Sequence, residues 1–257
     1  MIGAIIGDVV GSRFEFNNHR SKDFELITKE STYTDDSILT IAIMDYFLHK
    51  DETHENISTY LQKWVRKYPW GGYGGNFNRW IYSDDPKPYN SCGNGSAMRV
   101  SAVGYVANSL DEVLELSYEV TACTHNHIEG LKGAYVTAAL IYLARTGKTK
   151  EELKAFANEY YDIDLDYEDL RKNYYFTELC QDSVPQAIYC FLISNSFEDC
   201  LRTTISIGGD CDTTAAISCA IAEAYYKEIS EPLVESVKNK LTSDMIKVVN
   251  EFSENYK

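Results

Sequence analysis

Hydrophobic residues recur at helical spacing along most of the chain. The pattern predicts helices over segments 38–48, 100–106, 110–121, 128–145, 183–194, 197–205, 213–226, 231–240 and 243–256. The β-branched residues fall at positions that helices accept, and no segment alternates apolar and polar residues as a half-buried strand does. We therefore expect an all-α protein with roughly ten or more helices.

Local signals place several helix ends. Gly147 follows segment 128–145, as glycine often follows a helix C-terminus. Thr149 and Glu152 have the spacing of a capping box, which predicts another helix start there. Thr242 or Ser243 is the expected cap of the last helix.

Segments 12–33, 66–98 and 162–176 lack the helical pattern and are expected to be irregular. The middle segment includes Tyr68–Gly75 (YPWGGYGG), so it is predicted to be a long loop, and long loops in compact domains often carry function. No change in composition divides the chain. Residues 1–257 are therefore expected to form a single domain.

The chain has 24 basic and 39 acidic residues, giving a formal net charge of −15, and 44% of its residues are hydrophobic. This composition is globular and excludes disorder as the main state. The acidic excess argues against a basic surface for nucleic acid or anionic lipid, although a small phosphate compound needs only a local site.

The seven cysteines form no paired C-x-x-C units, which favours reduced, buried thiols. There is no secretory signal and no apolar run long enough to span a bilayer. We expect a cytoplasmic protein without a membrane partner. The sequence does not indicate an oligomeric state.

Two helix starts are unusually rich in oxygen ligands. Thr34-Asp35-Asp36-Ser37 precedes the apolar helix at 38–48, and on its own it is read more simply as an N-cap. Gly208-Gly209-Asp210-Cys211-Asp212-Thr213 repeats the signature before a second helix, and two such starts are hard to explain as caps. If the segments meet, they offer four carboxylates and two hydroxyls, which suit a pair of Mg²⁺, Mn²⁺ or Ca²⁺ ions. Cys211 would then point away from the site.

Three other motifs carry weaker signals. Gly93-Asn94-Gly95-Ser96-Ala97-Met98-Arg99 could bring backbone N–H groups close to an anion, or it could be a plain turn. Gly3, Gly7 and Gly11 have the spacing that lets helices pack closely, and Glu15 lies just beyond them. His125 and His127 fit no common zinc pattern, so one histidine is expected to be a hydrogen-bonding site residue.

Taken together and in this order, the motifs resemble the ADP-ribosylglycohydrolase family. That family includes the dinitrogenase reductase-activating glycohydrolases and the ADP-ribosylarginine and ADP-ribosylserine hydrolases. The resemblance extends from residue 3 to about residue 226 and also includes Thr124-His125 with Glu129-Gly130. It implies an all-α orthogonal helical bundle with a dinuclear Mg²⁺ or Mn²⁺ centre at the bottom of a cleft.

The resemblance also implies roles for individual residues. The metal ligands would be Thr34, Asp35, Asp36, Asp210, Asp212 and Thr213. The substrate-binding residues would be Gly93, Asn94, Gly95, Ser96, Met98 and His125, with the phosphates on the loop at 93–96. Glu15 matches the mobile acidic residue that closes over the substrate, and Glu15, Asp35 and Asp36 are the candidate catalytic carboxylates. Some relatives have an aromatic residue where this chain has Cys92, so Tyr89 or an aromatic from Trp70–Phe77 would support the adenine.

The leading hypothesis is a hydrolase that cleaves the glycosidic bond between ADP-ribose and an acceptor, using a metal-oriented water at C1″. A catalytically silent relative that binds ADP-ribose is the main alternative, and a dinuclear phosphoesterase is another, although such sites usually include histidines. The acceptor stays open among arginine, serine, a nucleobase and an ester. The segment Trp64–Trp80 is a candidate for the acceptor side or a plain surface loop.

Overall fold

The computed structural model describes residues 1–256, and within them the backbone is helical with no β-strand. The α-helices are α1 (Gly3–Gly11), α2 (Asp35–Thr53), α3 (Ile57–Lys67), α4 (Gly75–Ile81), α5 (Gly95–Met98), α6 (Ser101–Val106), α7 (Leu110–Thr121), α8 (Ile128–Arg145), α9 (Lys150–Ala157), α10 (Tyr167–Asn173), α11 (Cys180–Ile193), α12 (Phe197–Ser206), α13 (Cys211–Tyr226), α14 (Glu231–Lys238) and α15 (Ser243–Asn255). A 3₁₀ turn, η1 (Ser12–Phe14), follows α1. The all-α prediction is confirmed.

The predicted capping signals are confirmed. Helices α7 and α8 have the predicted bounds, and Gly147 follows α8 with φ of +93°. The hydroxyl of Thr149 accepts from the backbone N–H of Glu152, and the Glu152 carboxylate accepts from the Thr149 N–H at 2.9 Å. Thr242 is the N-cap residue of α15.

The prediction of irregular structure is wrong at three short helices. Helices α4 and α5 lie within segment 66–98, and α10 lies within segment 162–176. Helix α4 begins among glycines, and tertiary packing of Phe77, Trp80 and Ile81 stabilises it. Helix α3 was not predicted either, although its buried residues have a regular amphipathic spacing.

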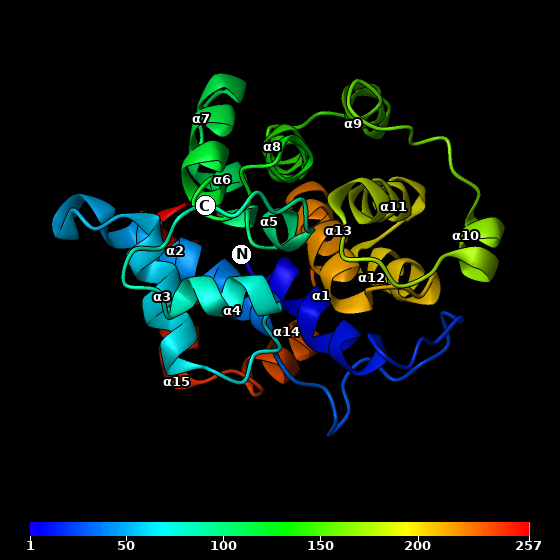
Figure 1. Cartoon of the computed structure of the whole chain (residues 1–257). Helices are drawn as coiled ribbons and strands as arrows, with labels where there is room; N and C mark the ends of the chain where they lie inside the picture. The colour runs from blue at the N-terminus through cyan, green and yellow to red at the C-terminus, as the bar shows by residue number, and fades with distance from the viewer. Residues whose placement is uncertain (257) are drawn as a thin grey trace.

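Helices α1 and α13 lie side by side at the centre of the molecule (Figure 1). Glycines on α1 allow this approach, as their spacing predicted. A Cβ on Gly7 would overlap the carbonyl of Ala215, and one on Gly11 would lie 2.6 Å from Cα of Asp212. The close contact brings Asp8 of α1 next to the start of α13.

A tight turn before α13 fixes the direction of that helix. Gly208 and Gly209 have φ of +76° and +77°, a region that favours glycine. The amide of Asn18 holds the turn by donating to the Gly209 carbonyl at 2.9 Å and accepting from the Gly209 N–H at 2.8 Å. A side chain on Gly209 would collide with the ring of Tyr174.

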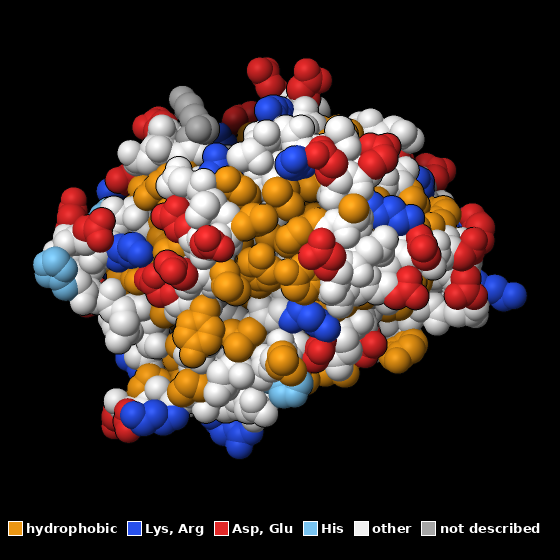
Figure 2. All heavy atoms as spheres, turned by 90° about the horizontal axis from the view of Figure 1, so that it is seen from above, with side chains coloured by type: hydrophobic (Ala, Val, Ile, Leu, Met, Phe, Trp, Pro, Cys, Tyr) orange, Lys and Arg blue, Asp and Glu red, His pale blue; other side chains and the backbone are white. Residues whose placement is uncertain are grey.

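The surface agrees with the charge of the chain. Figure 2 views the molecule from the top of Figure 1. On that face, acidic side chains surround an apolar area, and the basic side chains are scattered and form no continuous patch. None of the helices within residues 1–256 combines the length and the apolar character that a bilayer-crossing segment needs. All seven cysteines have free thiols, as predicted, and five of them are buried; Cys92 and Cys123 are only partly buried, contrary to the prediction.

Candidate active site

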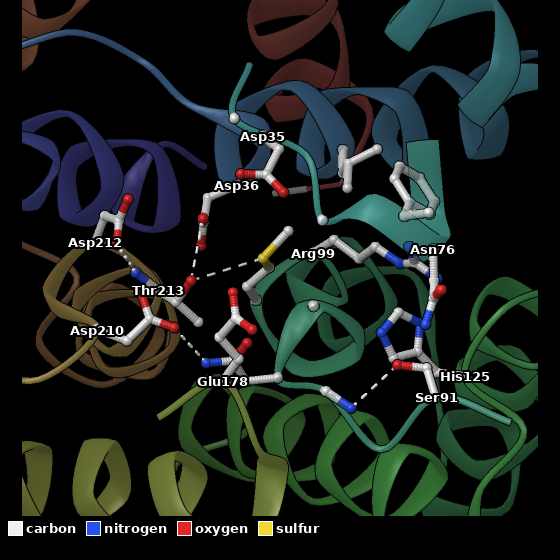
Figure 3. A pocket seen from close by; sticks show the side chains of 18 of the residues that line it. Asp35, Asp36, Asn76, Ser91, Arg99, His125, Glu178, Asp210, Asp212 and Thr213 are labelled. Carbon is white, nitrogen blue, oxygen red and sulfur yellow. Dashed lines mark hydrogen bonds between the residues drawn. The ribbon is translucent and has the colours of Figure 1, made fainter. Parts of the chain in front are cut away.

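The two acidic helix starts meet beside α1. Asp36 from the start of α2 and Asp212 from the start of α13 lie with Asp8, with one ligand oxygen of each within 4.8 Å of the others. A second set, with ligand oxygens within the same 4.8 Å of one another, contains Asp212, Asp210 and Glu15. Asp212 belongs to both sets, so the structure places two adjacent clusters of carboxylates around one side chain. Figure 3 shows Asp36, Asp210 and Asp212 on one side of the pocket.

Asp8 organises the first cluster and was not predicted as a functional residue. Its carboxylate accepts from the N–H and hydroxyl of Thr34 at 2.9 and 2.7 Å, and from the N–H of Ser37 at 3.0 Å. It also accepts from the Ser37 hydroxyl. These bonds anchor the turn that carries Asp35 and Asp36. The sequence did contain a signal for a role of Asp8, because it is a carboxylate in an otherwise apolar helix.

The donor atoms fit hard divalent cations. Oδ1 of Asp36 is buried without a hydrogen-bond partner, while its Oδ2 accepts from the Thr213 hydroxyl at 3.2 Å. Within the described chain, no Lys or Arg forms an ion pair with the carboxylates of either cluster. Buried carboxylates without counter-charges are costly, and oxygen-binding cations would neutralise them. Cys211 donates to the carbonyl of Ile205 and points away, as expected.

Burial and mutual repulsion raise the pKa values of these carboxyls. Burial is the main cause for Asp35, Asp36 and Asp212, whose pKa values lie well above the usual range, and neighbouring Asp side chains add to it. Burial also raises the pKa of Asp210 to about 7. Burial followed by the charge of Asp212 raises the pKa of Glu15 to about 8.

These shifts predict how the stability of the metal-free protein depends on pH. A carboxyl whose folded pKa is raised keeps more protons in the folded state than in the unfolded state, so stability falls as pH rises through the folded value. Without metal, the thermal midpoint is expected to decrease as the pH is raised from about 4 to about 8, the upper limit being the pKa of Glu15. Thermal unfolding across this range checks the slope. A midpoint that rises with pH would contradict it, and saturating Mg²⁺ should flatten the fall.

The Gly93–Ser96 loop lies beside the clusters, but most of its N–H groups have partners. The N–H of Gly93 donates to Ser91 Oγ at 3.2 Å, and the N–H of Asn94 donates to the Glu178 carbonyl at 2.7 Å. The N–H of Ser96 makes a longer bond of 3.5 Å to the Gly93 carbonyl. Among residues 1–256, only the N–H of Gly95 in this loop has no protein acceptor.

The side chains of this loop serve different purposes. Asn94 Nδ2 donates to Asp210 Oδ2 at 2.7 Å, which orients that carboxylate. Ser96 is fully buried, and its hydroxyl donates to the Gly93 carbonyl, so the structure does not bring it into the pocket. Met98 lines the pocket, with its sulfur 3.8 Å from the Thr213 hydroxyl.

Opposite the carboxylates, the pocket has a less acidic half. Figure 3 shows Arg99, Asn76, His125 and Ser91 together on that side. His125 is where it was expected, whereas His127 caps α8 by accepting from the Glu129 N–H at 3.1 Å. No cluster suited to a metal among the described residues contains a histidine.

Several pocket residues were missed. The pocket residues Ser91, Arg99 and Glu178 had no individual predicted role, and Asn76 was expected only as part of the segment Trp64–Trp80. Tyr89 and Phe77 line the pocket and Cys92 does not. From the segment Trp64–Trp80, the pocket receives Gly72, Gly74, Gly75, Asn76 and Phe77.

Comparisons with known proteins agree with this geometry. The chain is 27% identical to "ADP-ribosylhydrolase ARH3" from Mus musculus, over 88% of this chain and 82% of that protein. It is 25% identical to "ADP-ribosylarginine hydrolase Tri1" from Pseudomonas putida, over 88% of this chain and 69% of that protein. A solved structure described as an "ADP-ribosylglycohydrolase-related protein complex" superposes with a TM-score of 0.75 at 21% identity, covering 100% of this chain and 96% of that one, which supports the fold.

The family comparison covers the whole chain. The family model described as ADP-ribosylglycohydrolase matches residues 1–257, which includes both carboxylate clusters and the glycine loop. The order and placement of the motifs agree with that match. The chain therefore belongs to the ADP-ribosylglycohydrolase family.

Proposed function

We propose that this protein is a metal-dependent hydrolase that cleaves the glycosidic bond between ADP-ribose and an acceptor. The observation that carries the proposal is the pair of buried carboxylate clusters that share Asp212 and border a pocket whose other half is less acidic and offers hydrogen-bonding groups. Carboxylate oxygens without basic partners suit Mg²⁺ or Mn²⁺. Family membership supports the ADP-ribosyl substrate.

The proposed ligand set has six predicted members, Thr34, Asp35, Asp36, Asp210, Asp212 and Thr213. Asp8 supports them through the Thr34–Ser37 turn, and its nearness to Asp36 and Asp212 makes it a further candidate. Two bound cations would orient the attacking water and the ribose hydroxyls and lower the pKa of that water.

Glu15 is the proposed proton acceptor for the attacking water. It is the partly exposed member of the second cluster, and its carboxylate lies close to those of Asp210 and Asp212, where it could reach a water held at that cluster. Asp35 and Asp36 lie at the start of α2 and are the alternatives. The acceptor that leaves would take up a proton from the same group.

Glu15→Gln separates the role of Glu15 in proton transfer from its role in the second carboxylate cluster. The substitution is expected to lower kcat by about 100- to 1000-fold, because Gln cannot carry the proton. It should retain the increase in thermal midpoint on adding Mg²⁺, because Gln keeps an oxygen ligand. Steady-state kinetics and thermal unfolding measure the two effects. An unchanged kcat would transfer the role to Asp35 or Asp36.

The rest of the ligand is proposed to occupy the other half of the pocket. The free N–H of Gly95 and the ring of His125 would meet the diphosphate, and Tyr89 or Phe77 would support the adenine. Met98 lies between the two halves, where the distal ribose would sit.

Calorimetry together with a turnover assay tests this proposal against the silent alternative. ADP-ribose should bind in the presence of Mg²⁺ and bind much more weakly after chelation, because the empty clusters repel the diphosphate. A panel of arginine-, serine- and ester-linked ADP-ribose conjugates should include at least one substrate. Tight binding with no turnover of any conjugate would support a silent ADP-ribose-binding relative. No binding at all would contradict both readings.

A further inference from the structure

Arg99 is a buried cation that forms no ion pair within the described residues. Its side chain is fully buried at the C-terminus of α5, and its Nε and Nη1 have no hydrogen-bond partner. The one hydrogen bond that its guanidinium makes within residues 1–256 runs from Nη2 to the hydroxyl oxygen of Thr124, at 2.7 Å. Burying a charge in this way is expensive, so a structural reason alone would favour an apolar side chain.

The Thr124 hydroxyl connects Arg99 to His125. A guanidinium can only donate, so Arg99 occupies a lone pair on Thr124 Oγ1, and the single hydroxyl proton must go to another acceptor. Nδ1 of His125 lies 2.8 Å away, whereas the Thr121 carbonyl is at 3.4 Å. That carbonyl already accepts the N–H groups of Thr124 and His125, at 3.1 and 3.0 Å. The shorter distance and the already occupied Thr121 carbonyl favour donation from the hydroxyl to Nδ1.

The direction of this bond decides where the imidazole carries its proton. With Nδ1 accepting, neutral His125 carries hydrogen on Nε2. Nε2 faces the glycine loop, 3.3 Å from the Cβ position of Gly95 and 3.6 Å from that of Gly93, and it has no hydrogen-bond partner among the described residues. A Cβ on Gly130 would lie 3.1 Å from Cβ of His125, so glycines leave room for the ring on both sides.

We propose that Arg99 is a positioning residue that, through Thr124, holds His125 as the neutral tautomer that donates from Nε2 to an oxygen of the bound ligand. The identification of that oxygen as part of ADP-ribose rests on the proposed function; the relay itself does not. The relay supplies a donor next to Gly95, the one loop residue whose N–H is free.

The electrostatic surroundings agree with this geometry. Burial, followed by the charge of Arg99, lowers the pKa of His125 well below its usual value. Tyr89 faces the ring, with centroids 6.2 Å apart, and Glu178 lines the same pocket. On α8, Glu129 is paired with Lys132 at 2.8 Å. Burial and the charge of Arg99 therefore act in the same direction, and both favour the neutral form of His125.

The wild-type protein provides the first test, without ligand or metal. Long-range ¹H–¹⁵N correlation spectra of the histidine-labelled chain report the tautomer of each ring, and His125→Gln identifies the signal by its loss. The expected result is an Nε2–H ring that does not titrate between about pH 5.5 and 8. A proton on Nδ1, or titration near pH 6.5, would overturn the proposal.

Variants test the relay from Arg99 through Thr124 to His125 and its effect on ligand binding. Thr124→Val removes the hydroxyl and should release His125 into a tautomer mixture, while Thr124→Ser should restore the wild-type spectrum. Arg99→Met removes the second cause of the low pKa of His125 and should raise that pKa, while burial still holds it below the usual value. The affinity of this variant for ADP-ribose in saturating Mg²⁺, relative to wild type at the same pH, should fall as pH rises through the new pKa of His125.

The outcomes separate this inference from the proposed function. An Nε2–H ring in a protein that never binds ADP-ribose would support the relay and refute the proposed ligand. ADP-ribose binding with an unchanged His125 spectrum in both Thr124→Val and Arg99→Met would refute the relay and leave the function intact. If Arg99→Met does not fold, Thr124→Val and Thr124→Ser decide the matter.

Discussion

Asp212→Asn is expected to lower the rate of ADP-ribosyl hydrolysis by at least about 1000-fold, which corresponds to about 4 kcal/mol of transition-state stabilisation. Asp212 is the side chain that both carboxylate clusters share, so its loss should weaken both cation positions. The replacement is nearly isosteric. Its amide oxygen can still accept from the Thr213 N–H, a bond of 3.0 Å in the structure.

The folded state should survive this substitution. Removing one of several repelling buried carboxylates should keep or raise the thermal midpoint of the metal-free protein. The increase in midpoint on adding Mg²⁺ should disappear. Asp84→Asn is the matched control, because Asp84 is exposed and its substitution changes the net charge by the same amount. Full activity in Asp212→Asn with Mg²⁺ present would refute the proposed metal centre.

Gly7→Ala is expected to destabilise the protein by about 3 kcal/mol or more. The new Cβ would overlap the backbone of Ala215 in α13, and a backbone carbonyl cannot move aside as a flexible side chain can. The two central helices would have to separate. That movement would also pull Asp8 away from Asp212, so metal affinity should fall together with stability.

Urea unfolding at one pH measures the effect as a shift in midpoint at constant slope. Gly75→Ala, at the first position of α4, is the matched control, because a Cβ there meets no atom within 4 Å. That variant should be neutral or slightly stabilised, since alanine reduces the entropy of the unfolded chain. Equal midpoints for Gly7→Ala and wild type would show that the contact between α1 and α13 is looser than described.

The parts of this molecule that follow from local sequence were predictable. Helical spacing and capping signals gave most of the fold, because each depends on residues within a turn or two of one another. The oxygen-rich starts at Thr34–Ser37 and Gly208–Thr213 were visible for the same reason. The short helix α4 was missed because tertiary packing stabilises it more than its own sequence does. Helix α10 has a local signal, the N-cap Asp166, which was overlooked.

The remaining features depend on contacts between distant segments. The role of Asp8 requires α1 to lie against α13 and next to the turn before α2. The Asn94 N–H is occupied because the Glu178 carbonyl, 84 positions away, pairs with it, as the isolated bridge between Gly93 and Leu179 also shows. No spacing rule in the loop could reveal that partner. The relay from Arg99 is likewise visible only in three dimensions.

The central claim is that hydrolysis depends on cations held by the shared carboxylate clusters. Titration of metal-stripped protein with Mn²⁺, following bound Mn²⁺ and release of ADP-ribose from an accepted conjugate in the same samples, tests it most directly. We predict no release in the presence of a chelator, and a rate that reaches its maximum only when two equivalents are bound. Undiminished hydrolysis by the chelated protein would contradict this account.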